Sequence, residues 1–173
     1  MLNSKLGLMK KLFFLLLLLS TFVANAQYAL PEGKSQLNAG IGLSTWGIPF
    51  YVGFDYGVHT DISAGAEVSF RSYNEKILGF RYKHNIIGIS GNANYHFNGI
   101  TDIPEEFDIY AGLNIGFYIW NSSSDYAGNS ASGLGIGAQV GGRYYFNDKT
   151  AVNLEIGGGN AFGGGKIGLT IKL

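Results

Sequence analysis

Apolar and polar residues alternate along most of this chain. Between Phe107 and Trp120 the odd positions are all apolar, whereas the even positions carry Asp, Tyr, Gly, Asn, Gly, Tyr and Trp. Successive side chains of a β-strand point to opposite faces, so this segment has one apolar face and one polar, glycine-rich or amphipathic face. A helix would scatter both sets around its circumference. The segment is therefore predicted to be a strand.

The same alternation recurs from residue 35 to the end of the chain. Turn-forming residues are concentrated between the alternating segments, as expected for a chain that reverses repeatedly. Eight consecutive strands with such connections are typical of an all-β, antiparallel up-and-down barrel. The predicted strands cover residues 35–46, 50–58, 62–73, 85–97, 107–120, 132–146, 151–158 and 165–173.

The first 26 residues carry a different pattern. Three lysines precede an apolar run from Leu12 to Ala24, and Ala24-Asn25-Ala26 has the small-x-small pattern of a signal-peptidase site. The run is shorter than the roughly 20 residues that a membrane-spanning helix needs. We predict a cleavable signal peptide over residues 1–26 and a barrel over residues 27–173, with Met9 as an alternative start of the same signal.

The direction in which the polar faces point decides between a soluble barrel and a membrane barrel. Charged residues make up 14% of the chain, well below the usual quarter. Few charges and many small polar residues suit a narrow lumen better than a solvated exterior. The apolar faces carry aromatic residues mainly near strand ends and aliphatic residues between them, which is the distribution that a bilayer selects. The predicted lumen charges, balanced in sign, are Asp55, Glu67, Arg71, Asp108, Arg143, Glu155, Lys166 and Lys172.

With these features the chain resembles the small eight-stranded outer-membrane β-barrels of the OmpX and OmpA type, and the porin-family barrels of Bacteroidota. The resemblance rests on the signal ending Ala-Asn-Ala-Gln, the alternating strands and the final strand, residues 166–173. It implies a bacterial outer-membrane location, contact with outer-membrane lipid and lipopolysaccharide, and insertion by the barrel-assembly machinery. Family members usually end on an aromatic residue, whereas this chain ends on Leu173.

The predicted turns also indicate which lumen charges are neighbours. Counting outward from the turn between strands 107–120 and 132–146 places Asp108 directly opposite Arg143 in the lumen. The next hairpin places Arg143 opposite Asn153 by the same count. Extending the count to the last strand predicts one cluster of Asp108, Arg143, Glu155 and Lys172.

No motif in the sequence indicates an enzyme, a cofactor or a metal site. Ser90 and His96 face the lumen together with Glu67, but six residues on one strand separate that serine from the histidine by about 20 Å. The three histidines lack the further ligands that zinc requires. Basic and acidic residues number 12 each, so no basic field indicates nucleic acid.

An eight-stranded barrel is just wide enough to be filled by its own side chains. We therefore expect a non-enzymatic outer-membrane protein with a filled lumen and a structural or surface-binding role. The basic and aromatic segment 80–83 is expected to be either an ordinary solvated loop or a contact for lipopolysaccharide phosphates or a host surface. A narrow channel, a soluble periplasmic lipocalin-like binder and a lipid-modifying enzyme stay open as alternatives. The loops expected to face the exterior are residues 47–49, 74–84, 121–131 and 159–164.

Overall fold

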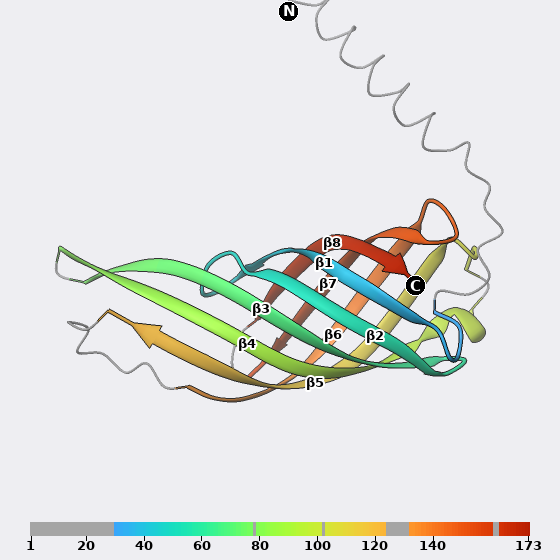
Figure 1. Cartoon of the computed structure of the whole chain (residues 1–173), viewed down its shortest axis with the longest axis horizontal. Coiled ribbons are helices and arrows are strands. Elements are labelled where there is room, and N and C mark those ends of the chain that lie inside the picture. The colour runs from blue at the N-terminus through green and yellow to red at the C-terminus, as the bar shows by residue number, and fades with distance from the viewer. Residues whose placement is uncertain (1–29, 78, 102, 124–131, 161–162) are drawn as a thin grey trace, which may run out of the picture.

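The computed structural model describes residues 30–77, 79–101, 103–123, 132–160 and 163–173, so the predicted signal peptide lies outside it. These residues form a closed antiparallel barrel in which each strand pairs with the next and the last pairs with the first (Figure 1). The predicted fold is confirmed. The strands are β1 (Ser35–Ser44), β2 (Phe50–His59), β3 (Ile62–Ile77), β4 (Phe80–His96), β5 (Phe107–Ser122), β6 (Gly133–Tyr145), β7 (Thr150–Gly159) and β8 (Gly163–Lys172), with a short 3-10 helix η1 (Phe97–Gly99) before β5.

The barrel has two distinct ends. The turn end carries the connections β2–β3, β4–β5 and β6–β7, and Leu173 bonds there through its amide to the Ser35 carbonyl. Gly33 also joins this end through a hydrogen bond from its amide to the Gly57 carbonyl, 2.9 Å long. The loop end carries the other connections. Among the described residues, none forms a helix of the length and hydropathy that a membrane crossing requires.

The largest departure from the sequence prediction is the hairpin of β3 and β4. A loop was expected over residues 74–84, but β3 continues to Ile77 and β4 begins at Phe80. Because β2 pairs with β3 only as far as Phe70, the hairpin extends past its neighbour as a long ribbon at the loop end (Figure 1). The outward side chains of this extension are polar. A strand in lipid excludes such side chains, whereas a strand beyond the bilayer accepts them. The other strand ends lie within two residues of their predicted positions.

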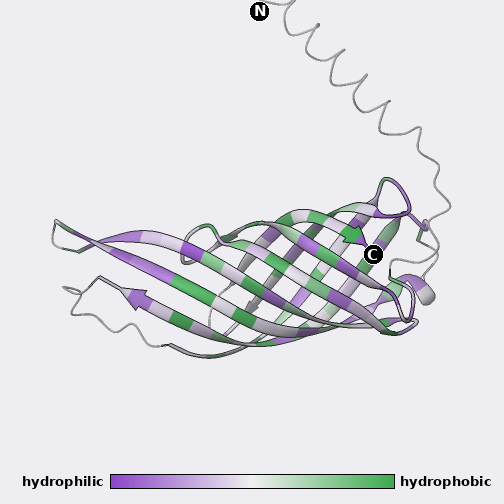
Figure 2. Ribbon diagram, viewed as in Figure 1, coloured by the Kyte–Doolittle hydropathy of each residue, from purple (hydrophilic) through white to green (hydrophobic). Residues whose placement is uncertain are grey.

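The apolar strand faces point outward and the polar faces point into the lumen. On β5, Leu113 is 67% exposed whereas Asp108 is fully buried. Hydropathy alternates along the strands in the same way (Figure 2). An exterior of exposed Leu, Ile, Val and Phe suits lipid and not water. This orientation is the reverse of the one that a soluble lipocalin-like barrel requires.

Aromatic side chains lie near both margins of the apolar belt. At the turn end the ring of Phe107 packs against that of Tyr144 with 5.0 Å between centroids, and Tyr95 packs edge-on against Phe97. At the loop end Phe50 of β2 is the strand partner of Phe70 on β3. Such girdles mark the two interfaces of a bilayer.

The inside–outside assignment predicts different behaviour for arginine at two adjacent positions of β5. Leu113→Arg places a cation in the apolar belt, and we expect it to lower the free energy of unfolding in lipid by about 2–4 kcal/mol. Asn114→Arg places a larger side chain in the lumen instead. There the Asn114 amide donates to Gln139 at 2.8 Å, so the added arginine atoms would crowd Gln139. Shortening that neighbour by Gln139→Ala should therefore rescue Asn114→Arg and leave Leu113→Arg unrescued. Urea unfolding in lipid vesicles measures both effects, and equal tolerance of the two arginines contradicts the assignment.

Candidate functional site in the barrel lumen

The lumen is filled by polar side chains that form two ionic clusters. The turn-end cluster consists of Asp55, Asp108 and Arg143 together with His96 and Ser63. The central cluster lies nearer the middle of the barrel, where Lys166 contacts Glu67 and Glu155.

Arg143 is the centre of the turn-end cluster. Its Nη1 donates to Asp108 Oδ2 at 2.7 Å and its Nη2 donates to Asp55 Oδ2 at 3.0 Å. The side chains of all three residues are at most 4% exposed. The guanidinium also lies 4.3 Å from the ring centroid of Tyr110. Asp108 is the direct strand partner of Arg143, and Asn153 is its partner on β7, both as the counting argument predicts. One cation thus joins β2, β5 and β6 across the lumen.

Neutral side chains donate further hydrogen bonds to Asp55. Its Oδ2 accepts from Gln36 Nε2 at 3.0 Å and from Asn38 Nδ2 at 2.9 Å. The side-chain oxygen of Gln36, Oε1, in turn accepts from the Tyr145 hydroxyl at 3.0 Å. A buried ion pair is stable only when such additional hydrogen bonds offset the loss of hydration. The cluster therefore depends on the polar residues around it as much as on the charges.

A serine–histidine–aspartate chain of hydrogen bonds, which the sequence analysis missed, extends from this cluster. His96 Nδ1 lies 2.7 Å from Asp108 Oδ1, and His96 Nε2 lies 2.9 Å from Ser63 Oγ. The arrangement has the connectivity of a nucleophilic triad. However, Ser63 is fully buried and lines neither of the two lumen cavities described below. We interpret the chain as a structural link between β3, β4 and β5.

The pairing of β3, β4 and β5 is sufficient to predict this hydrogen-bonded link. Ser63 lies opposite Asn94, and Tyr110 lies opposite His96, so Ser63 and Asp108 are diagonal neighbours on either side of the histidine. The serine that the sequence analysis considered, Ser90, lines the cavity nearer the loop end instead.

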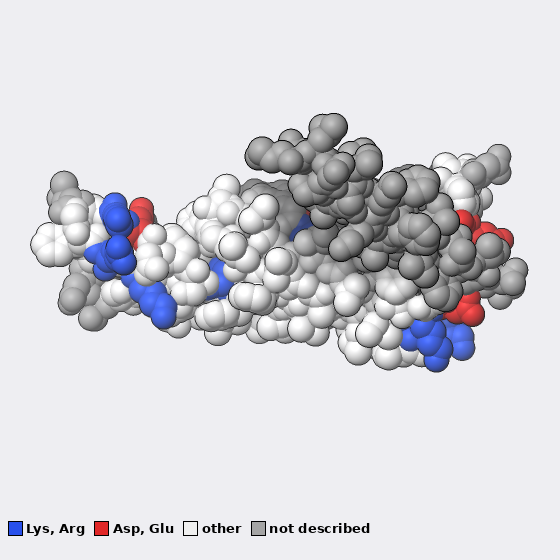
Figure 3. Space-filling view, turned by 90° about the horizontal axis from the view of Figure 1, so that it is seen from above, with Lys and Arg blue, Asp and Glu red and all other residues white. Residues whose placement is uncertain are grey.

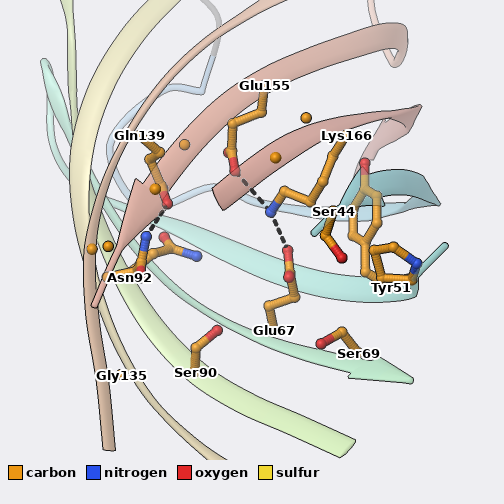
Figure 4. Close-up of a pocket in the computed structure, with 18 of the residues that line it drawn as sticks. Ser44, Tyr51, Glu67, Ser69, Ser90, Asn92, Gly135, Gln139, Glu155 and Lys166 are labelled. Carbon is orange, nitrogen blue, oxygen red and sulfur yellow. Dashed lines mark hydrogen bonds and ion pairs between the residues drawn. The ribbon is translucent and has the colours of Figure 1, made fainter. Parts of the chain in front are cut away.

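Lys166 is the centre of the central cluster. Its Nζ lies 2.7 Å from Glu67 Oε2 and 2.8 Å from Glu155 Oε1 (Figure 4), and it lies 4.9 Å from the ring centroid of Tyr51. Glu155 is the strand partner of Lys166, whereas Glu67 approaches from β3 across the lumen. The Tyr110 hydroxyl donates to Glu155 Oε2 at 3.0 Å. Because Tyr110 also lies under Arg143, it connects the two clusters.

The predicted contact between Glu155 and Lys172 is wrong. Glu155 pairs with Lys166, six residues nearer the loop end, because β7 reaches Gly159 and β8 begins at Gly163. Lys172 lies instead at the turn end, with its Nζ 4.0 Å from the ring centroid of Tyr145. The predicted cluster of four therefore divides between two sites.

Arg71 belongs to neither cluster. It is 2% exposed, and its Nη1 donates to Ser44 Oγ at 3.2 Å while its Nη2 approaches Ser69 Oγ at 3.5 Å. These contacts place the guanidinium in the half of the lumen nearer the loop end.

Two cavities lie on either side of the central cluster. The upper cavity, toward the loop end, has a volume of about 90 Å³ and includes Arg71 and Ser90 in its lining. The lower cavity has a volume of about 20 Å³ and is bounded toward the turn end by Asp55 and Arg143. The three residues of the central cluster line both cavities. The lumen is therefore closely packed near the turn end. Its larger cavity lies toward the loop end, where the rings of Trp46, Tyr73, His84 and Trp120 also pack together.

A closed barrel of eight antiparallel strands with a lipid-facing belt and an ion-paired lumen is an integral outer-membrane β-barrel. Residues 14–170 match the family model described as the outer membrane protein beta-barrel domain, and the chain belongs to that family. The protein is thus located in the bacterial outer membrane.

Several solved structures share the fold at low sequence identity. The N-terminal β-barrel domain of Pseudomonas aeruginosa OprF is 16% identical, with 82% of this chain and 98% of that chain covered and a TM-score of 0.56. Yersinia pestis Ail is 13% identical, with 82% and 99% covered and a TM-score of 0.57. Pseudomonas aeruginosa OprG is 11% identical, with 83% and 97% covered and a TM-score of 0.63. No curated protein sequence matches the chain significantly.

The turn-end cluster predicts that losing the cation alone is worse than losing it together with one of its partners. Arg143→Met leaves two buried carboxylates without their shared cation, and we expect the free energy of unfolding to fall by about 3–5 kcal/mol. Arg143→Met combined with Asp108→Asn should be more stable than Arg143→Met alone. Urea unfolding in lipid vesicles measures both, with the exposed Lys76→Met as a control expected to change stability by less than about 0.5 kcal/mol. Simple additivity of Arg143→Met and Asp108→Asn contradicts the coupling.

Proposed function

We propose that this protein is a non-enzymatic, non-conducting outer-membrane barrel whose long β3–β4 hairpin binds phosphate groups of lipopolysaccharide at the cell exterior. The observation that carries the proposal is a basic face on the part of the hairpin beyond β2. Lys76, Arg81 and Lys83 form this face, and we refer to them as the basic face.

Strand register brings these three cations close together. Lys76 is the direct strand partner of Arg81, and Lys83 follows two residues later on the same face. All three are exposed, and basic side chains gather at the loop end in Figure 3. Like charges directly opposite each other destabilise a strand pair. An anion bound between them offsets this repulsion, so the pairing favours an anionic partner.

The height of the basic face matches the region where lipid headgroups lie. Phe70 and Ile87 are paired at the loop-end margin of the apolar belt. Lys83 pairs with Asn74, roughly 13 Å beyond Phe70 along β3, and Lys76 lies roughly 20 Å beyond it. Strand tilt reduces both heights above the bilayer. Phosphates of lipopolysaccharide are the anions expected at this level of the outer leaflet.

Among the residues that the structure describes, no acidic side chain lies on the same face of the extension as these cations. The outward positions of the extension carry Ser72, Asn74 and Asn85 besides the three cations. The neighbouring carboxylate, Glu75, points to the other face, where it lies 3.3 Å from His84 Nε2.

The non-conducting part of the proposal is supported by the lumen contacts. Arg143 and its two carboxylates fill the turn-end half with side chains at most 4% exposed. The cavities on both sides of the central cluster favour a narrow channel as the second candidate. A rearrangement of Lys166 would join the two cavities, and a further rearrangement of Arg143 would open the turn end. The absence of an accessible nucleophile at Ser63 supports a non-enzymatic role.

Removal of charge from the basic face should weaken lipopolysaccharide binding. We expect Lys76→Gln/Arg81→Gln to reduce the affinity for fluorescent lipopolysaccharide at least fivefold, measured with the folded protein in phospholipid nanodiscs. Lys34→Gln/Lys149→Gln removes the same charge at the turn end and should change the affinity less than twofold. Dephosphorylated lipopolysaccharide should bind all variants weakly.

Two results would contradict the phosphate assignment. One is an equal loss of affinity in both double variants. The other is binding to a sulfated polysaccharide with no binding to lipopolysaccharide. The second outcome is included because Ail, which shares this fold, has been solved in complex with the heparin analogue sucrose octasulfate.

Planar-bilayer recording tests the closed lumen. We expect no discrete conductance steps from the wild-type protein, because the turn-end cluster fills the lumen. Arg143→Ala, which removes the largest side chain of that cluster, is the comparison that should introduce conductance. Steady steps from the wild-type protein at low voltage overturn the non-conducting proposal and favour the channel.

A further inference from the structure

The upper cavity exists because one wall of the lumen carries almost no side chains. In the turn-end half, the inward positions of β6–β8 carry large side chains such as Arg143, Tyr145 and Asn153. In the loop-end half, the inward positions of the same strands are mostly glycine. Those that line the cavity are Gly135, Gly137, Gly157, Gly159 and Gly164.

Close strand packing accounts for most of these glycines, because a Cβ at residue 137, 157, 159 or 164 would lie less than 3 Å from a carbonyl oxygen of a neighbouring strand. A Cβ at residue 159 would collide with the Ile136 carbonyl, and one at residue 164 would collide with the Leu43 carbonyl. Gly133, the next inward position of β6 beyond the cavity, would meet nothing within 4 Å. A small barrel is normally filled by side chains, so the glycines on this wall leave a space that no side chain of β6–β8 occupies.

The opposite wall is polar. Hydroxyl and amide groups of β1 and β3–β5 line this wall and supply both donors and acceptors; Ser69, Ser90 and Asn92 are among those labelled in Figure 4. The residues that carry these groups are Ser44, Ser69, Ser90, Asn92, Asn114 and Tyr118. A lining of this kind suits a hydrophilic ligand and not an acyl chain.

The floor of the cavity is ionic and remains accessible. The side chains of Lys166, Glu67 and Glu155 are 24%, 18% and 13% exposed, against at most 4% for the ion pairs of the turn-end cluster. Two carboxylates share one ammonium, so the floor has a formal charge of −1.

The wall above the floor is cationic. Arg71 lies on β3 four residues beyond Glu67 toward the loop end, on the same inward face. The cavity therefore carries a positive group on its upper wall and a net negative group at its floor. A molecule that carries both charges is complementary to this arrangement, whereas a simple anion or cation matches only one end.

We propose that the upper cavity is a binding pocket for a small zwitterion of the amino-acid type. The ligand carboxylate lies toward Arg71 and its ammonium toward Glu67 and Glu155, with the remaining atoms against the glycine wall. The cavity volume of about 90 Å³ limits the ligand to a few heavy atoms, since a cavity of roughly 150 Å³ holds benzene. The central cluster forms the floor and closes the cavity toward the turn end.

Calorimetry with glycine tests the pocket on the full mature protein in detergent. We expect saturable binding of glycine, and at least tenfold weaker binding of glycolate, which lacks the cation, and of ethanolamine, which lacks the anion. Equal binding of glycerol would show that the pocket recognises hydroxyl groups and would overturn the zwitterion assignment. No binding of any probe would overturn the proposal altogether.

Paired variants locate the binding in the lumen. Ser90→Phe fills the cavity and should abolish glycine binding, whereas Ile89→Phe adds the same ring to the lipid-facing side and should leave the affinity within twofold. Ile89 is 53% exposed on that side. Glu67→Gln keeps the shape but neutralises the floor, and should weaken glycine binding at least tenfold if Ser90→Phe does not fold. Unchanged affinity in Ser90→Phe or in Glu67→Gln contradicts the site, and neither variant touches the basic face.

Discussion

The absence of water in the bilayer core is the constraint on which the rest of this structure depends. Backbone groups in lipid must be paired within the protein, so the sheet closes on itself and every strand has two neighbours. Eight strands enclose a lumen that side chains can fill. All polar side chains of the membrane-spanning strands must then fit inside it. Their charges must pair there, because an isolated ion so far from water is very costly.

The two halves of the lumen meet this requirement differently. In the turn-end half, Arg143 joins Asp55 and Asp108 with almost no exposed surface, and amides and hydroxyls complete the bonding. In the loop-end half, glycines leave a cavity above Lys166 and its carboxylates. Tyr110 links the two halves through its hydroxyl and its ring. The turn-end half is thus close-packed, whereas the loop-end half holds the larger cavity.

The sequence predicted the features that depend on neighbouring strands. Period-two alternation located the strands and their faces. Counting from the connection between β5 and β6 placed Asp108 opposite Arg143, and counting from the turn after Tyr145 placed Arg143 opposite Asn153. It did not predict contacts across the lumen, such as Arg143 with Asp55 or Lys166 with Glu67, because these depend on the tilt of the closed barrel. The predicted contact of Lys172 with Glu155 was wrong because the run of glycines between β7 and β8 does not indicate at which residue the chain turns. The β3–β4 extension was mistaken for a loop because the outward polar residues there lie beyond the lipid.

The most direct test of the inverted, closed barrel is the accessibility of single residues along β5. The chain contains no cysteine, so single cysteines at residues 109–119 can be spin-labelled one at a time in lipid vesicles. Electron paramagnetic resonance then measures collision with oxygen, which is concentrated in lipid. The account predicts high oxygen accessibility at odd positions, with a maximum near Leu113, and low values at even positions. Maxima at even positions, or no period of two, would contradict it.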